Sequence, residues 1–151
     1  MKIKLDTGAY MPTIAHKERD AGFDFYTPTK AIVSGAKGRV SIDGGLDIRL
    51  GSVTIDTGVH VEIPKGYVGF IKSKSGLNVN HGLTAEGVID SGYTGSIRVK
   101  LYNHTEKPYI FERGDKIAQL VILPIITPEL ELVDELEQTE RGDGGFGSTG
   151  R

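Results

Sequence analysis

Turn signals break this chain at short intervals, and this feature restricts its fold more than any other. Glycine accounts for 21 of the 151 residues, roughly twice its ordinary share. Between the turns, apolar and polar residues alternate with the period of two that is typical of β-strands. Strands are expected at 2–5, 21–26, 52–56, 59–63, 68–72, 97–102 and 117–123. Closely spaced strands of this kind predict one all-β domain, a jelly-roll-like sandwich or barrel, rather than alternating strands and helices.

Three other segments complete the expected fold. A single short helix is expected at residues 75–81, with Ser75 as its N-terminal cap. Residues 35–51 are read as an added hairpin or loop. Residues 129–140 carry six acids, and their leucines are spaced in a way that favours an edge strand over a helix. An acidic run is usually a solvated face, so no function is assigned to it.

Composition excludes several classes of function. The net charge of −2 gives no broad basic surface, so no nucleic-acid partner is expected. The absence of cysteine removes disulfides, thiolate catalysis and zinc–cysteine sites, and is compatible with a reducing cytosol. No apolar run approaches the length of a signal peptide core or a membrane span. We therefore expect a cytoplasmic protein without a membrane partner.

The segment GVIDSGYTG, residues 87–95, has the spacing of a hairpin with its turn at Ser91 and Gly92. Asp90 stands at the edge of this turn, three residues before Tyr93. A carboxylate placed there could orient a water molecule beside a flat ring. The alternative is an Asx-turn, in which Asp90 only caps its own backbone.

A second candidate lies at the start of the expected helix, in the segment KSKSGL, residues 72–77. Two lysines, two serines and a glycine at a helix N-terminus favour an anion such as phosphate. The segment lacks the glycine spacing of a Walker A motif. The alternative is an ordinary capped helix with solvated lysines.

Two polar residues interrupt apolar strands and need partners. Gln119 stands inside the apolar run of residues 114–122, and Asp24 inside AGFDF, residues 21–25. A buried amide or carboxylate bonds either to main chain or to a ligand, and the sequence leaves both open. The four histidines do not pair with acids at metal-ligand spacing, so a metal-hydrolase or Ser-His-Asp interpretation has no support.

The stretch RGDGGFGSTG, residues 141–150, is half glycine and holds neither a helix nor a strand by itself. Its arginine, phenylalanine and Ser-Thr pair suit a mobile lid over an anionic ligand with a flat ring. The alternative is a flexible tail without function.

Taken in order, these five segments resemble the five motifs of the homotrimeric deoxyuridine triphosphatase (dUTP diphosphatase) family. AGFDF, SKSGL, GVIDSGYTG, GDKIAQLVI and RGDGGFGSTG run from residue 21 to residue 150. The resemblance implies a jelly-roll subunit of a homotrimer with three shared active sites. Each site would take the first, second and fourth motifs from one chain, the third from another and the fifth from the remaining one. Residues 1–140 would form the β domain and 141–151 its lid.

The resemblance also implies a reaction and a role for each matching residue. Water would attack the α-phosphorus of dUTP in line, giving dUMP and pyrophosphate, which limits uracil in DNA and supplies dUMP for thymidylate synthesis. Asp90 would be the general base and would bond the 3′-hydroxyl. Tyr93 would pack under the deoxyribose, and main-chain groups near Gly87 and Arg98 would read the edge of uracil.

The remaining roles concern the phosphates and the lid. Mg²⁺ would span the three phosphates, with Asp24 reaching it through bound water. The resemblance implies that the phosphate contacts come from Lys74, Ser75, Gly76 and Gln119, and that the lid contributes Arg141 on the γ-phosphate, Phe146 stacked on uracil, and Gly147, Ser148 and Thr149.

The chain departs from the family pattern at three places. Lys74 replaces the usual arginine and keeps its charge without the bidentate fork. Thr84 stands near the position where some members use asparagine to bond uracil. Residues 35–51 match no recognised part of the family.

Two alternatives remain. The related dCTP deaminases carry a catalytic glutamate on the strand after the hairpin, where this chain has Lys100, and they lack the GFGSTG tail. The other alternative is a non-catalytic jelly-roll protein that binds or regulates. The presence of five residues argues against it: Asp90, Tyr93, Gln119, Arg141 and Phe146.

Overall fold

A computed structural model gives the arrangement of residues 1–40 and 46–144, and the fold is described for these ranges. The strands are β1 (Lys2–Leu5), β2 (Gly22–Tyr26), β3 (Ala31–Val33), β4 (Lys37–Val40), β5 (Leu46–Arg49), β6 (Gly51–Asp56), β7 (Val59–Glu62), β8 (Tyr67–Lys72), β9 (Leu83–Ile89), β10 (Arg98–Asn103), β11 (Tyr109–Phe111) and β12 (Lys116–Pro124). The helix α1 (Ser75–His81) connects β8 to β9. No helix in these ranges has the length and apolar character needed to cross a bilayer.

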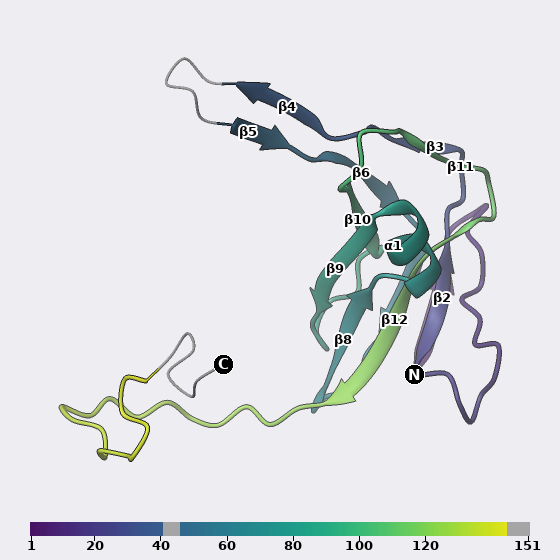
Figure 1. Cartoon of the computed structure of the whole chain (residues 1–151). Helices are drawn as coiled ribbons and strands as arrows, with labels where there is room; N and C mark the ends of the chain where they lie inside the picture. The colour runs from purple at the N-terminus through teal and green to yellow at the C-terminus, as the bar shows by residue number, and fades with distance from the viewer. Residues whose placement is uncertain (41–45, 145–151) are drawn as a thin grey trace.

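The main sheet is curled and has six strands in the order β2-β12-β8-β9-β10-β6. All of its pairs are antiparallel, and β12 lies between β2 and β8, which are far from it in sequence (Figure 1). Three two-stranded sheets, β1–β7, β3–β11 and β4–β5, complete the molecule. The result is a jelly-roll-like β fold, as the sequence predicts.

Alternation along the strands builds one apolar core. In β10, Val99 and Leu101 are buried while their neighbours face outward. Ile71 of β8 and Leu120 of β12 are register partners in the main sheet, and each is about 1% exposed. Residues of β7 close the same core from the β1–β7 side. Burial of these side chains is the main favourable contribution to the fold.

The expected strands are all confirmed to within one or two residues, and so is the helix. The expected cap is wrong, because Lys74 occupies the N-cap position with extended backbone angles and no side chain caps the helix. Strands β3 and β11 escape prediction because three residues are too few to show an alternation. The edge strand expected at residues 129–140 is also wrong: within the described ranges this segment is exposed and has no regular secondary structure.

The added segment near residues 35–51 is a hairpin of β4 and β5, which projects from one end of the molecule (Figure 1). Glycines fix its base by close approach of backbones. A Cβ built on Gly35 would lie 1.9 Å from the Glu106 carbonyl oxygen, and one on Gly51 would lie 1.6 Å from that of Ser34. Neither position accommodates a side chain without movement of the backbone.

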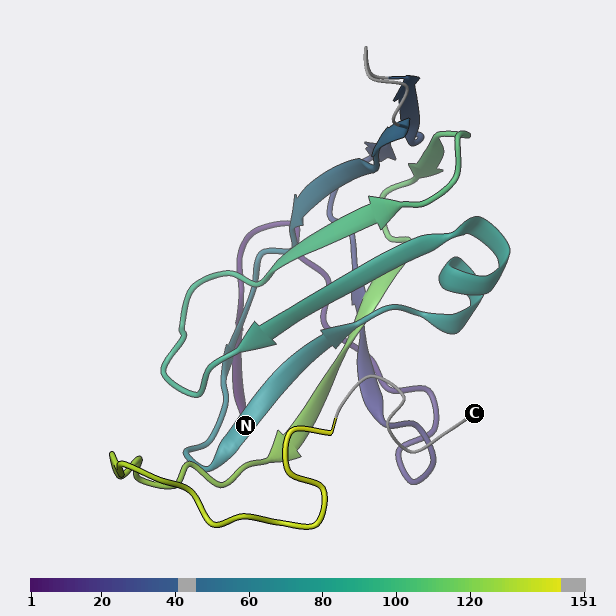
Figure 2. The ribbon, with the colours of Figure 1, turned by 60° about the vertical axis from the view of Figure 1, so that its left-hand side comes forward.

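Beyond β12, residues 125–144 form no regular secondary structure; Figure 1 shows them extending away from the sheet, and in Figure 2 they lie at the bottom of the view. Large apolar side chains are exposed along this segment, with Ile126, Leu130 and Leu132 each more than 90% exposed. Exposed apolar surface of this kind marks a site that another surface covers.

Candidate active site

The first part of the site is a carboxylate held between two lysines. Asp24 lies on β2 and is 8% exposed. Its Oδ2 accepts a hydrogen bond from Lys116 Nζ at 2.8 Å, and its Oδ1 accepts one from Lys74 Nζ. Burial raises the pKa of the Asp24 carboxyl, but hydrogen bonds and charges from Lys116 and Lys74 outweigh it, so its pKa lies below the ordinary value. The same contact raises the pKa of Lys116.

The sheet register places Gln119 beside this cluster. Gln119 on β12 is opposite Asp24 on one side and Lys72 on the other. Its Nε2 donates a hydrogen bond of 3.1 Å to the main-chain carbonyl of Ser73. The amide thus has the main-chain partner that the sequence left open, and it holds the segment that leads from β8 into α1.

Ser73 and Lys74 form the turn between β8 and α1. The Ser73 hydroxyl accepts a hydrogen bond of 2.8 Å from the Ala85 amide and donates one to the Ala85 carbonyl. This contact ties the turn to β9 and thereby places Lys74 beside Asp24. The next residues, Ser75 and Gly76, begin the helix, and a Cβ on Gly76 would meet nothing within 4 Å. Space therefore lies open beside the helix start.

Asp90 stands at the end of β9, in the turn that the sequence predicts. The Tyr93 amide donates to the Asp90 carbonyl at 3.0 Å, which closes the turn over Ser91 and Gly92. The Asp90 side chain is exposed, and within residues 1–40 and 46–144 no group donates a hydrogen bond to its carboxylate. The Asx-turn alternative is therefore not seen. Tyr93 folds back over Gly95 and donates its hydroxyl to the Ser96 carbonyl at 2.8 Å.

Strands β9 and β10 separate next to this turn. Their register pairs run only from Leu83–Asn103 to Ala85–Leu101. On their other sides both strands continue in pairing, β9 with β8 as far as Ile89 and β10 with β6 from Arg98 onward. The facing main-chain groups of residues 86–89 and 98–100 therefore lack a partner strand. They are available donors and acceptors for a flat molecule placed between the strands.

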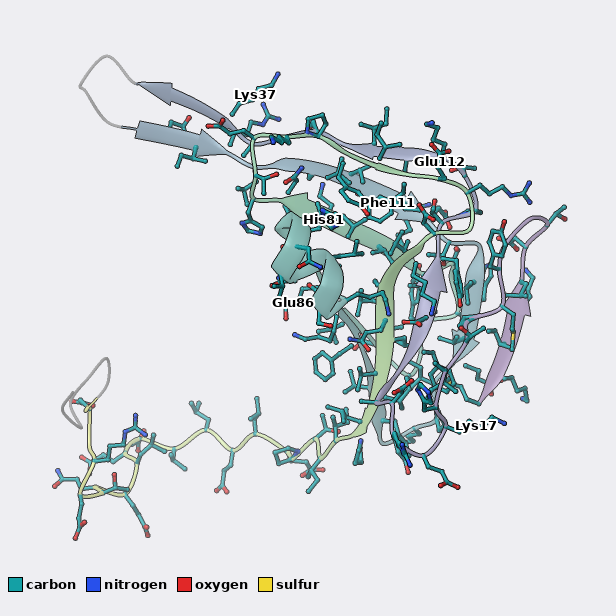
Figure 3. The ribbon with its side chains drawn as sticks, turned by 45° about the vertical axis from the view of Figure 1, so that its right-hand side comes forward. Lys17, Lys37, His81, Glu86, Phe111 and Glu112 are labelled. Atoms are coloured by element: carbon teal, nitrogen blue, oxygen red, sulfur yellow. The ribbon has the colours of Figure 1, made fainter. Side chains whose placement is uncertain are left out.

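The two parts of the site lie at opposite ends of the main sheet. Lys72 is the register partner of Glu86, which Figure 3 shows beside α1. Asp90 follows Glu86 by four strand residues, or about 13 Å. Lys74 and the helix start lie beyond Lys72 in the opposite direction. One chain thus brings Asp24, Lys74 and Gln119 together, but it does not bring them to Asp90.

The other predicted residues divide into three groups. The Thr84 hydroxyl is bonded to His104 Nε2 at 2.8 Å, in the paired part of β9. Arg141 lies in the exposed segment after β12 and donates its Nε–H to the Gly144 carbonyl at 2.9 Å, within a local turn. Phe146, Gly147, Ser148 and Thr149 lie outside the described residues.

The donor set bears on the Mg²⁺ expectation. Within the described ranges no three side chains form a cluster that could hold a metal ion. Both oxygens of Asp24 are engaged by lysines. Direct coordination by the protein does not fit this arrangement. Contact through bound water does fit it, because Mg²⁺ keeps several waters and takes its direct ligands from substrate phosphates.

Comparison with known proteins agrees with this geometry. The dUTPase family model matches residues 9–150. The chain is 40% identical to the deoxyuridine 5′-triphosphate nucleotidohydrolase of Gloeobacter violaceus over 143 residues, which cover 93% of the chain and 88% of the relative. It is 38% identical to that of Clostridium tetani over 155 aligned positions, which cover 100% of the chain and 97% of the relative. The chain belongs to the dUTPase family.

Solved structures share the fold over nearly the whole chain. The Staphylococcus bacteriophage 80alpha dUTPase with dUPNHPP has a TM-score of 0.82 and 32% identity, and the match covers 99% of this chain and 98% of that one. A mutant dUTPase from phage phi11 of S. aureus, solved to show how a structural Mg(II) ion is coordinated, has a TM-score of 0.74 and 30% identity. That match covers 91% of this chain and 98% of that one.

Sequence reasoning missed two contributors to the site. In the sequence, Lys116 looks like any lysine in a strand. The signal that could have identified a cation partner was the carboxylate of Asp24 inside an apolar strand, which needs a positive charge nearby. Asp56 was also missed: it accepts hydrogen bonds from Ser96, from Arg98 at 3.3 Å and from the Gly58 amide at 3.1 Å. These donors lower the pKa of Asp56, the Ser96 hydroxyl first among them. The contact joins β6 to the loop after Asp90, and only the folded register reveals it.

Proposed function

We propose that the chain hydrolyses dUTP to dUMP and pyrophosphate, with Asp90 as the general base that holds the attacking water. The observation that carries this proposal is the separation of β9 and β10 beside the exposed Asp90 carboxylate. A pyrimidine inserted between these strands would meet main-chain donors and acceptors near Gly87 and Arg98. Close backbones on both sides would exclude a 5-methyl group and so would separate uracil from thymine.

Tyr93 supports the selection of the sugar. It follows Asp90 by three residues, and its ring is held in place by the bond to Ser96. A ring fixed under the deoxyribose would exclude a 2′-hydroxyl by contact. Asp90 would then bond the 3′-hydroxyl and orient the water for in-line attack.

The cluster of Lys74 and Lys116 around Asp24 supports the proposal that the triphosphate binds at this end of the sheet. Lys74 is partly exposed, and it adjoins the open space beside Ser75 and Gly76, so its charge is available to phosphate. Gln119 would add a contact to a phosphate oxygen. Mg²⁺ bound to the phosphates would reduce their repulsion toward the attacking water, with Asp24 touching it through water. The lid, residues 141–151, would bring Arg141 to the γ-phosphate and Phe146 to uracil, with Gly147, Ser148 and Thr149 beside them.

A homotrimer with shared sites is part of the same proposal. Because Lys74 and Asp90 lie at opposite ends of one sheet, a complete site needs a second chain to supply one of them. The exposed apolar residues after β12 support contact with further chains. The cytoplasmic location and the absence of a nucleic-acid partner stay predictions.

The first test is pyrophosphate release from dUTP, dTTP, dCTP and UTP in the presence of Mg²⁺. We expect pyrophosphate from dUTP alone. Absence of dUTP turnover would refute the proposal, and ammonia from dCTP would assign the chain to the deaminases. Asp90→Asn should bind a non-hydrolysable dUTP analogue normally but lose roughly 10²- to 10⁴-fold in kcat.

The second test mixes subunits. Asp90→Asn and Lys74→Met chains are unfolded together, refolded as mixed trimers and assayed at a low dUTP concentration, at which each variant alone turns over little substrate. A mixed trimer contains sites that combine an intact Asp90 from one chain with an intact Lys74 from another, so turnover should return. Failure of mixed trimers to recover any turnover would contradict shared sites.

A further inference from the structure

A histidine outside the five motifs touches the loop that carries Asp90 and Tyr93. His60 lies on β7, with a side chain 18% exposed. Its Nδ1 is 2.8 Å from the Thr94 carbonyl oxygen, and its Nε2 is 3.1 Å from Asp6 Oδ2. Thr94 directly follows Tyr93 in the loop. The imidazole therefore bridges the loop to the segment that follows β1.

The rest of the loop has few anchors. At its far end Ile97 is bound by its main chain to Thr57 and Val59, and Ser96 donates to Asp56. In the described part of the chain, His60 is the one side chain from outside the loop that hydrogen-bonds to residues 90–95. Removal of this contact would leave those residues held by the Asp90–Tyr93 turn and by the bond of the Tyr93 hydroxyl to the Ser96 carbonyl, both of which lie within the loop.

We propose that His60 is a positioning residue for nucleotide hydrolysis, which acts by fixing the Thr94 carbonyl and so the loop that bears Asp90 and Tyr93. The inference rests on the proposed function, because it assigns that loop to base, sugar and water positioning. His60 touches no substrate in this assignment. It acts through the main chain of its neighbour.

The protonation state of His60 controls the contact. Both of its partners, a carbonyl oxygen and a carboxylate, are hydrogen-bond acceptors, so only the doubly protonated ring donates to both. When one proton is lost, the remaining one bonds better to the charged Asp6 than to the neutral carbonyl. The contact with the loop is then the one that weakens.

The surroundings of His60 favour the charged ring. The hydrogen bond to Thr94 and then the bond and charge of Asp6 raise the pKa of His60, while burial and the charge of Lys4 act against them. Lys2 and Glu62 line the same cavity of about 350 Å³ as His60, and the loop contributes no charged side chain to it. Because the pKa is raised, the contact is complete below the ordinary value of 6.5 and weakens as pH rises through the higher folded value.

The experiment compares two substitutions at this position. His60→Ala removes both bonds and should lower kcat/KM for dUTP by roughly 3- to 10-fold, the range of one hydrogen bond. His60→Asn offers an amide N–H to the Thr94 carbonyl and does not titrate. We expect it to recover most of the loss, and we expect the ratio of wild-type to His60→Asn activity to fall between pH 6.5 and pH 9.

His16→Ala is the matched control. His16 also pairs with an aspartate, Asp20, at 3.4 Å, but it has no contact with the loop among the described residues. Its substitution should leave kcat/KM and the pH profile unchanged. Equal losses in His60→Ala and His60→Asn, or a pH-independent activity ratio, would overturn the proposal in favour of a merely structural role.

Hydrogen exchange of the nucleotide-free protein separates this inference from the proposed function. Amides of residues 91–95 should exchange faster in His60→Ala than in wild type and His16→Ala, whatever the substrate is. Unchanged exchange in this loop would refute the positioning role. Faster exchange in a protein that fails to hydrolyse dUTP would instead leave His60 as a loop anchor and refute the assigned reaction.

Discussion

Replacement of Asp24 by asparagine tests whether the lysine cluster is held by charge. The carboxylate is 8% exposed and accepts hydrogen bonds from both Lys74 and Lys116. Charge-assisted hydrogen bonds contribute roughly 1.5–3 kcal/mol each. The lysine side chains are 28% and 43% exposed, so their ammonium groups can return to water, and exposed ion pairs are worth only about 0–1 kcal/mol. We therefore expect Asp24→Asn to lower the free energy of unfolding by about 2 kcal/mol.

The pH dependence has a definite sign. The pKa of Asp24 is lowered in the folded protein, so its contribution to stability is complete above the ordinary value of 3.8. It is lost as pH falls through the lower folded value. The stability difference between wild type and Asp24→Asn should thus be constant from pH 7 to pH 5 and should shrink as pH falls below 3.8 and through the lower folded value.

The measurement is thermal unfolding at a fixed protein concentration, because association between chains makes Tm depend on concentration. A loss of about 2 kcal/mol corresponds to a fall in Tm of roughly 4–8 °C for a chain of this size. Glu62→Gln is the control, since Glu62 pairs with Lys2 in an exposed contact. The charge argument would be contradicted if the Tm of Asp24→Asn lay within about 1 °C of wild type at pH 7. It would also be contradicted if the Tm difference between Asp24→Asn and wild type were the same at pH 7 and at pH 3.

Three further predictions concern the lid, the hairpin base and the phosphate contact. Truncation before Arg141 should leave Tm unchanged while kcat/KM falls by about 10- to 100-fold, the range of a lost charge-assisted contact; an unfolded product would show that the tail is structural. Gly51→Ala should cost about 3 kcal/mol because its Cβ would strike the Ser34 carbonyl, whereas Gly76→Ala, with open space around it, should leave stability nearly unchanged, as chemical denaturation would show. Lys74→Met should raise KM for dUTP by roughly 10- to 100-fold and Lys74→Arg by less than about threefold, in steady-state assays; equal effects would exclude a role for the charge.

Much of the fold could be predicted because its information is local. The alternation of Val99 and Leu101 and the positive φ of Gly58, Gly66 and Gly114 in turns are visible as patterns in the sequence. What could not be predicted is the pairing of distant strands. The position of β12 between β2 and β8 depends on packing of the whole core, so no local pattern contains it.

In the site, too, local features can be predicted from the sequence and tertiary contacts cannot. The turn at Asp90 follows from residue types, and the structure has it as predicted. The cap at Ser75 fails because the choice between Ser75 and Lys74 is made by the Ser73 bond to β9, which is a tertiary contact. The contact of Lys116 with Asp24 likewise depends on strand register, and so does the reach of His60 to the loop.

The gap between β9 and β10 has a consequence for how specificity can change over time. Recognition there is assigned to amide and carbonyl groups, which every residue except proline presents in the same form. Exchanges of the outward side chains Glu86 and Val88 therefore leave the hydrogen-bonding pattern intact. A different base could be accepted only if the spacing of the two strands changed, and the core holds that spacing through Ala85 and Leu101. The packing of the interior therefore keeps the base selectivity of this enzyme unchanged when these exposed side chains are substituted.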